Sequence, residues 1–248
     1  MSGHSKWANI KRKKAVVDAQ KGKVFSKLTR EITAAARQGG GNPDGNFRLK
    51  TAIDKARASN VPQDNIQRAI QRGSGPGEGE QYEELLYEGY GPGGVAVMVE
   101  VLTDNRNRTA GEVRHLFAKH GGNLGESGCV AWMFDQKGLI QVEKEDAPGE
   151  DDLLLSATEA GAEDLREDEE SWDVVTGVDV LPAVKDALEQ GGVKVADAEV
   201  TYLPRSTVAV DGTDAERLLR LLDLLEEHDD VQRVHANFEM SDEEMERS

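Results

Sequence analysis

The chain has 248 residues and a formal net charge of -17, with 38% hydrophobic and 31% charged residues. This length suits two or three domains, and this composition is typical of a globular protein that buries its own cores. No apolar run approaches the roughly 20 residues that span a bilayer, and no apolar segment of a secretory signal follows the basic N-terminus. Since Cys129 is the only cysteine, an internal disulfide framework is excluded. We therefore expect a reducing, cytoplasmic location and no membrane partner.

The charge is divided unequally between two parts of the chain. Residues 1–75 hold 16 Lys or Arg and 5 Asp or Glu, a net of +11, whereas the remainder holds 14 and 42, a net of -28. A cationic segment gains affinity for a phosphate polymer by releasing condensed counterions. The asymmetry predicts a nucleic-acid partner for residues 1–75, and the alternative is a solvated, Lys-rich helix face.

The stretch SGHSKWANIKRKK (2–14) supplies most of the candidate binding residues. Lys and Arg side chains suit contacts with phosphates, which position a protein but read no base sequence. Trp7 has two interpretations, because an indole can stack on a base or anchor the segment on the protein's own surface. The candidate nucleic-acid-binding residues in this stretch and in the helix that follows are Lys6, Trp7, Lys11, Arg12, Lys13, Lys14, Lys21, Lys23 and Lys27.

Residues 23–73 predict three short helices. Apolar residues recur at helical spacing from Lys23 to Gly39, and the turn GGGNPDGN precedes a second helix over 47–59. Pro62 suits the first position of a third helix, which Gly73 follows. The residues expected to face inward are Val24, Leu28, Ile32, Ala35, Leu49, Ala52, Ile53, Ala56, Ile66, Ala69 and Ile70. The basic residues expected on the outside are Lys23, Lys27, Arg30, Arg48, Lys50, Lys55, Arg57, Arg68 and Arg72.

The glycine-rich stretch GSGPGEGE (73–80) predicts a linker, after which the periodicity changes. Strands over 95–102 and 129–134 are predicted to flank a helix over 110–120. Residues 139–204 then predict the order βαββαβ of a ferredoxin-like sheet, including helices that end at Gly161 and begin after Asp179. The predicted elements that follow are a strand over 206–211, a helix over 214–227 and a strand over 231–238.

These elements predict an α+β fold: an N-terminal three-helix domain plus two ferredoxin-like α/β domains, one inserted into the other. The helical domain with its basic N-terminal arm comprises residues 1–75. The split α/β domain comprises residues 76–138 and 205–240, and the inserted domain comprises residues 139–204.

The segment LTDNRNRTAGE (102–112) is a further candidate site, since it lies between a predicted strand and a predicted helix. Thr109 and Glu112 have the spacing of a capping box, and Arg106 and Arg108 precede the expected cap. A helix N-terminus favours anions, so the two arginines predict a phosphate or carboxylate site. The alternative is that they pair with Asp104, Glu112 or the acidic part of the chain.

Other motifs predict neither catalysis nor metal binding. GYGPGG (89–94) matches GxGxxG, but a strand follows it rather than a helix. His115 and His120 do not share a helix face, and Cys129 is expected in a core. We therefore expect no enzyme, cofactor, metal or small-molecule substrate; an enzyme in an inter-domain cleft and an acidic protein-binding scaffold are the alternatives from other classes.

Several stretches resemble the YebC/PmpR family: GHSKWANIK, KGKVFSKLTREI, GGGNPDGN, YEGYGPGG, LTDNRNRT, GGNLGESG followed by VAWMF, and AGAEDL. The resemblance covers residues 2 to about 242. It implies a bacterial cytoplasmic protein with one helical and two α/β domains around a cleft, and a probable DNA-binding regulator of transcription. A mitochondrial relative is a translational activator for a cytochrome oxidase subunit, which implies the alternative of RNA or the ribosome as partner.

Overall fold

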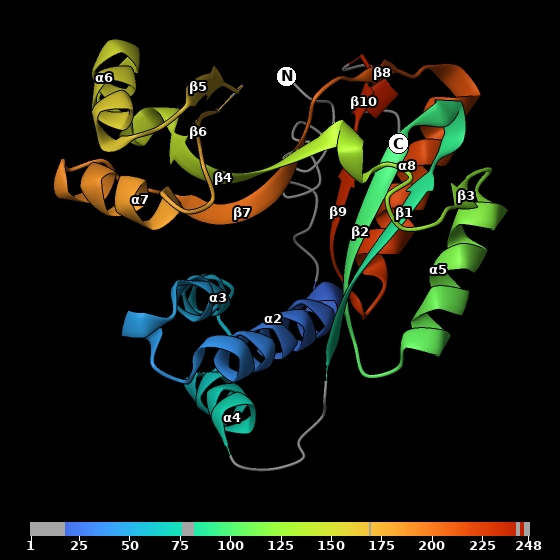
Figure 1. Ribbon diagram of the computed structural model, residues 1–248, viewed down its shortest axis with the longest axis horizontal. Helices are drawn as coiled ribbons and strands as arrows, with labels where there is room; N and C mark the ends of the chain where they lie inside the picture. The colour runs from blue at the N-terminus through green and yellow to red at the C-terminus, as the bar shows by residue number, and fades with distance from the viewer. Residues whose placement is uncertain (1–17, 76–81, 169, 242–243, 246–248) are drawn as a thin grey trace.

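The fold is described from a computed structural model of the chain, covering residues 18–75, 82–168, 170–241 and 244–245, with side chains from residue 22 onward. Three helices come first, and two antiparallel sheets with their own helices follow (Figure 1). The fold is therefore α+β, with a helical N-terminal domain and two α/β units, one inserted into the other, as predicted. No helix within the described ranges is long and apolar enough to cross a membrane.

The helical domain consists of α2 (Asp18–Gly39), α3 (Phe47–Ala58) and α4 (Gln63–Ser74), which pack around their own apolar cluster. The second helix lies where it was predicted, and Asn46 caps it by accepting a hydrogen bond from the Leu49 amide at 3.1 Å. Its expected inward residues are all buried: Leu49, Ala52, Ile53 and Ala56. The expectation for Val24 is wrong, since this side chain is 42% exposed.

Gly73 lies inside α4, not beyond its end as predicted. A Cβ at this position would stand 2.3 Å from the Thr33 carbonyl oxygen of α2. The missing side chain therefore lets α4 approach the backbone of α2 closely.

The first sheet has the order β3-β1-β2-β9, from β1 (Glu83–Tyr90), β2 (Ala96–Thr103), β3 (Asn123–Leu124) and β9 (Val231–Ala236). One face of β2 packs on α5 (Arg106–Lys119) and α8 (Gly212–Glu227), through residues that include Val97, Val99, Phe117 and Leu218. The opposite face, with Ala96 and Met98, packs on Val130 and Phe134. Side chains alternate between the faces of a strand, so β2 is buried on both sides.

The prediction of a strand over residues 129–134 is wrong. Ala131–Met133 form a 3-10 turn, and β4 (Phe134–Glu143) starts only afterwards. The Glu88 carboxylate of β1 accepts hydrogen bonds from the amides of Gly128, Val130 and Ala131 at 2.7–2.9 Å. These amides are therefore not available to a sheet. Burial opposes ionisation of Glu88, but the three amide bonds outweigh it and lower its pKa.

The inserted unit has the predicted order βαββαβ and the antiparallel sheet β5-β6-β4-β7, which is ferredoxin-like. Its further elements are α6 (Glu150–Ala160), β5 (Asp164–Glu167), β6 (Ser171–Thr176), α7 (Leu181–Gln190) and β7 (Asp197–Pro204). Gly161 ends α6 in the left-handed conformation, as expected. Val180, not Asp179, occupies the N-cap of α7. Two short strands, β8 (Val208–Ala209) and β10 (Phe238–Glu239), pair in parallel beside the first sheet.

Candidate nucleic-acid interface

The structure describes the side chains of four of the eleven predicted binding residues. Lys6, Trp7, Lys11, Arg12, Lys13 and Lys14 lie outside the described residues, and Lys21 belongs to α2 without a described side chain. Lys23, Lys27, Arg106 and Arg108 are placed, on α2 and α5. The structure brings Lys23 and Arg108 together, since both line one hollow beside the loop between α8 and β9.

One face of α2 docks on the C-terminal end of α8. Lys23 Nζ donates to the Glu227 carbonyl at 3.3 Å, and Lys27 Nζ donates to the Glu226 carbonyl. Arg30 donates to the Asp229 carbonyl at 2.8 Å in the loop that follows. The last carbonyls of a helix lack intrahelical partners and carry partial negative charge, so these cations complement the end of α8.

Asp230 is the centre of this contact. Its side chain is 3% exposed, and one carboxylate oxygen accepts from Arg30 at 2.8 Å. The other oxygen accepts from Arg108 and Thr109, each at 2.7 Å, and from Thr103 at 3.1 Å. Burial opposes ionisation of Asp230, but the hydrogen bonds from Arg108, Thr109 and Thr103 outweigh it and lower the pKa to about 2. One carboxylate thus joins α2, β2, α5 and the loop before β9.

The capping box predicted at Thr109 and Glu112 is wrong. Helix α5 starts four residues earlier than predicted, because the Asn105 side chain accepts the Arg108 amide at 3.1 Å and serves as the N-cap. The Thr109 hydroxyl is buried on Asp230, and Glu112 contacts His228 Nε2 at 2.8 Å. Helix capping is local, and Asn105 provides the better-placed acceptor.

The two arginines of this segment differ in surroundings. Arg108 pairs with Asp104 at 2.9 Å and with Asp230 at 2.7 Å, which is the pairing alternative that the sequence left open. These hydrogen bonds raise the pKa of its guanidinium. Arg106 is exposed on the first turn of α5. Within the described part of the chain, Arg108 has carboxylate partners, whereas Arg106 forms no ion pair with a carboxylate.

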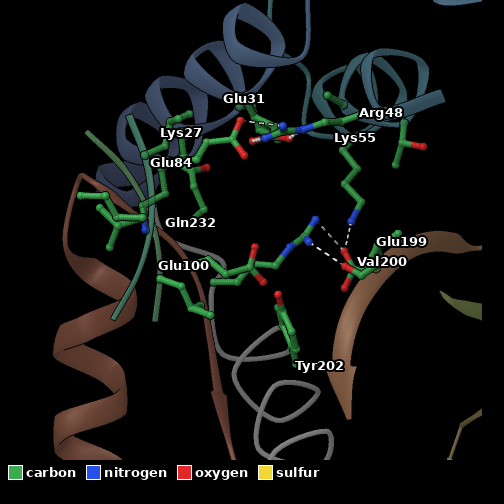
Figure 2. Close-up of a pocket in the computed structure, with 18 of the residues that line it drawn as sticks. Lys27, Glu31, Arg48, Lys55, Glu84, Glu100, Glu199, Val200, Tyr202 and Gln232 are labelled. Carbon is green, nitrogen blue, oxygen red and sulfur yellow. Dashed lines mark hydrogen bonds and ion pairs between the residues drawn. The ribbon is translucent and has the colours of Figure 1, made fainter. Parts of the chain in front are cut away.

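A second group of ion pairs joins α3 to the sheets. Arg48 bonds Glu31 at 2.7 Å and also reaches Glu84 of β1 at 2.7 Å. Lys55 pairs with Glu199 of β7 (Figure 2). It also lies 3.1 Å from Asp197. Lys27, Arg30, Arg48 and Lys55 are therefore half-buried against the acidic units, which corrects the expectation that they lie on the outside.

These ion pairs surround a hollow of about 640 Å³ between the helical domain and both sheets. Arg233 of β9 lies in its wall, 3.3 Å from Glu199, and donates to the Val200 carbonyl at 2.9 Å. Burial opposes ionisation of Glu199, but the charges of Arg233 and Lys55 outweigh it and lower its pKa to about 2. In this wall Arg48 faces Glu31 and Glu84, and both Lys55 and Arg233 face Glu199. The hollow is therefore a polar seam in which these charges are paired.

Sequence reasoning missed the wall residues on the strands. Glu100 bonds His235 at 2.6 Å. Burial opposes ionisation of Glu100, but the hydrogen bond from His235 outweighs it and lowers the pKa of Glu100. The available signal was a charged residue within an apolar strand pattern, as at Arg233 in VQRVHANF and at Glu100 in VAVMVEVL. Such a residue faces a partner or a polar seam, since an unpaired buried charge is costly.

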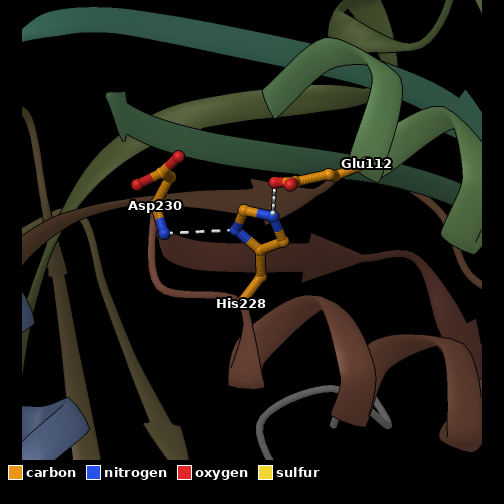
Figure 3. A group of neighbouring side chains, drawn as sticks. All are labelled: Glu112, His228 and Asp230. Atoms are coloured by element: carbon orange, nitrogen blue, oxygen red, sulfur yellow. Dashed lines mark hydrogen bonds and ion pairs between the residues drawn. The ribbon is translucent and has the colours of Figure 1, made fainter. Parts of the chain in front are cut away.

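Glu112, His228 and Asp230 lie close enough to hold a metal ion (Figure 3). Their donor atoms are, however, already engaged. His228 Nδ1 accepts the Asp230 amide at 3.1 Å, and both Asp230 oxygens accept from guanidiniums. A cation here would have to displace two positive charges, so the arrangement does not fit a metal site.

The fold and its ion pairs define a class of protein: a basic helical domain held on two nested acidic α/β units. Family models match both parts, as the TACO1/YebC protein N-terminal domain over residues 5–76 and the TACO1/YebC second and third domain over residues 82–238. The chain belongs to the TACO1/YebC family, which confirms the resemblance.

Relatives are similar over nearly the whole chain. A "Probable transcriptional regulatory protein" of Pelotomaculum thermopropionicum is 61% identical over 98% of this chain and 100% of its own length. A protein of the same name from Desulfitobacterium hafniense strain DSM 10664 / DCB-2 is 61% identical over 98% of this chain and 97% of its own length. The crystal structure of a conserved hypothetical protein from Aquifex aeolicus has a TM-score of 0.85 and 54% identity, over 92% of this chain and 94% of that one.

Proposed function

We propose that this protein is a nucleic-acid-binding regulator of gene expression, and specifically a DNA-binding regulator of transcription that acts by binding rather than by catalysis. The observation that carries the proposal is the segregation of charge, +11 in residues 1–75 against -28 in the rest. The name of the relatives, "Probable transcriptional regulatory protein", agrees with it. The single cysteine suits the reducing cytoplasm.

The helical domain retains cations for such a partner. Of its ten Lys and Arg residues from residue 22 onward, five are directed to the acidic units, and the other five are exposed. The exposed five are Arg37, Lys50, Arg57, Arg68 and Arg72. They add to the basic arm, whose Lys6, Lys11, Arg12, Lys13 and Lys14 are proposed to contact phosphates and whose Trp7 is proposed to stack on a base or anchor the arm.

The arm can be tested by its effect on salt dependence. We expect replacement of Lys11, Arg12, Lys13 and Lys14 by Gln to weaken binding of a mixed-sequence duplex DNA. The slope of log K against log salt should become shallower by about 0.9 for each lost phosphate contact. The matched control replaces four exposed cations of the α/β units by Gln: Lys119, Lys194, Arg217 and Arg220.

An equal change of slope in both variants would remove the arm from the proposal. Crosslinking in cells, followed by sequencing of the attached nucleic acid, tests the identity of the target. Recovery of chromosomal sites supports the regulator of transcription. Recovery of ribosomal or messenger RNA would replace it with the RNA- or ribosome-bound alternative.

A further inference from the structure

The contact between the helical domain and the acidic units is mostly ionic. Five cations of α2 and α3 reach across it, to carboxylates or to the carbonyls that end α8. The apolar cluster of the helical domain is formed by α2, α3, α4 and the adjoining Val61, and does not continue into either sheet. Among the described residues of this domain, Phe47 is the one that packs on the cluster of the inserted unit.

A contact of this kind is compatible with relative motion of the domains. Interfaces between domains that are small and polar permit relative motion, whereas large apolar ones do not. The hollow of about 640 Å³ lies within the contact, so part of it is not close-packed (Figure 2). Ion pairs between partly exposed groups are also weakened by salt and by competing anions.

The surface of the acidic units that contacts the helical domain resembles a polyanion in its negative charge. Glu84, Asp197, Glu199 and Asp230 present carboxylates to Arg48, Lys55 and Arg30, and the end of α8 presents carbonyl oxygens to Lys23 and Lys27. Guanidinium and ammonium groups that bind rows of carboxylates bind the phosphates of a nucleic acid by the same charge-assisted hydrogen bonds.

We propose that the docking face of the helical domain, formed by Lys23, Lys27, Arg30, Arg48 and Lys55, is a phosphate-binding surface that the acidic units cover in the closed protein. Nucleic acid that has engaged the exposed cations competes for this face and releases the helical domain from the sheets. The acidic units thereby lower the affinity of the closed form. This inference rests on the proposed function and adds a second, covered surface to it.

The test changes the acidic side and leaves every cation in place. The variant Glu84→Gln with Glu199→Gln removes two carboxylates that hold the docking face. Its matched control, Asp151→Asn with Glu159→Gln, removes the same charge from exposed positions of α6. The probes are a fluorescein-labelled mixed-sequence duplex DNA and a single-stranded RNA of equal length, at low ionic strength.

We expect the Glu84/Glu199 variant to bind roughly three- to tenfold more tightly than the control variant. Equal affinities of the two variants would overturn the inference. If the unaltered protein binds neither probe, the proposed function itself fails, which is a separate result.

A second measurement does not depend on the stability of those variants. Spin labels at Gln67→Cys of α4 and Leu155→Cys of α6, both exposed, report the separation of the helical domain from the inserted unit in a Cys129→Ser background. We expect the distance to lengthen when the duplex is added to the otherwise unaltered protein. A distance that stays the same while the duplex is bound would also overturn the inference.

Discussion

Asp230 and Arg108 form an ion pair of 2.7 Å that ties the loop before β9 to the first turn of α5. The same carboxylate holds Arg30 of the helical domain at 2.8 Å, so it links the helical domain to the first sheet. A nearly buried carboxylate with two guanidinium partners and two hydroxyl donors is fully satisfied, and removing its charge leaves those partners uncompensated.

We therefore expect Asp230→Asn to lower the free energy of unfolding by about 3 kcal/mol at neutral pH. Chemical denaturation checks this, with Asp229→Asn as the control, because Asp229 is an exposed neighbour that contributes its carbonyl to Arg30. A loss no larger than that of the control would show that the Asp230 carboxylate is not needed for stability.

The pKa of Asp230 also predicts a pH dependence. Its pKa is lowered from 3.8 to about 2, so its stabilisation is complete above pH 3.8 and is lost as the pH falls through about 2. The stability of the unaltered protein should therefore fall in this range by an increment that the Asp230→Asn variant lacks. Denaturant midpoints measured across the range for both proteins test it, and parallel curves would contradict it.

Arg106 and Arg108 should separate binding from stability. Arg108 has two carboxylate partners, so Arg108→Ala should lower the melting temperature. Arg106 is exposed, so Arg106→Ala should leave the melting temperature unchanged and weaken nucleic-acid binding. Thermal unfolding and duplex titration of both variants check this, and Arg108→Lys should restore part of the lost stability because it keeps the charge. Unchanged binding by Arg106→Ala would remove this residue from the interface.

Two helical glycines should respond in opposite directions to alanine. Gly73→Ala places a Cβ 2.3 Å from the Thr33 carbonyl, so α4 must move away from α2, and we expect a loss of about 1–3 kcal/mol. At Gly111 of α5 nothing lies within 4 Å of an added Cβ, so Gly111→Ala should stabilise by about 1 kcal/mol. Denaturant unfolding of both variants checks this, and a stabilising Gly73→Ala would contradict the close packing of α4 on α2.

Predictions of secondary structure agree with the structure where residues close together in the sequence determine whether a helix or a strand forms. Helix α3 and its four inward residues were predicted because apolar residues recur at helical spacing after the turn GGGNPDGN. The ferredoxin-like order of the inserted unit follows from six successive elements. By contrast, strand β1 was not predicted, because EELLYEGY has little apolar alternation and owes its pairing to β2.

Two of the errors share a cause, which is a partner far away in the chain. The apolar run around Val130 resembles a strand, but its amides bond Glu88, which lies 42 residues earlier. Thr109 resembles a helix cap, but its hydroxyl is taken by Asp230, which lies 121 residues later. No pattern within a window of the sequence contains such partners.

The amino-acid sequence by itself determined that a basic segment precedes an acidic one, because charge depends only on composition. It also determined the N-terminal helical domain and most of the later alternation of helices and strands, because these depend on the spacing of neighbouring residues. Only the tertiary structure decided which cations remain exposed. Lys27, Arg30, Arg48 and Lys55 have partners because folding brings the end of α8, Asp230, Glu84 and Glu199, respectively, against them. Charge is a property of each residue, but its partner is set by the packing of segments that are distant in the chain.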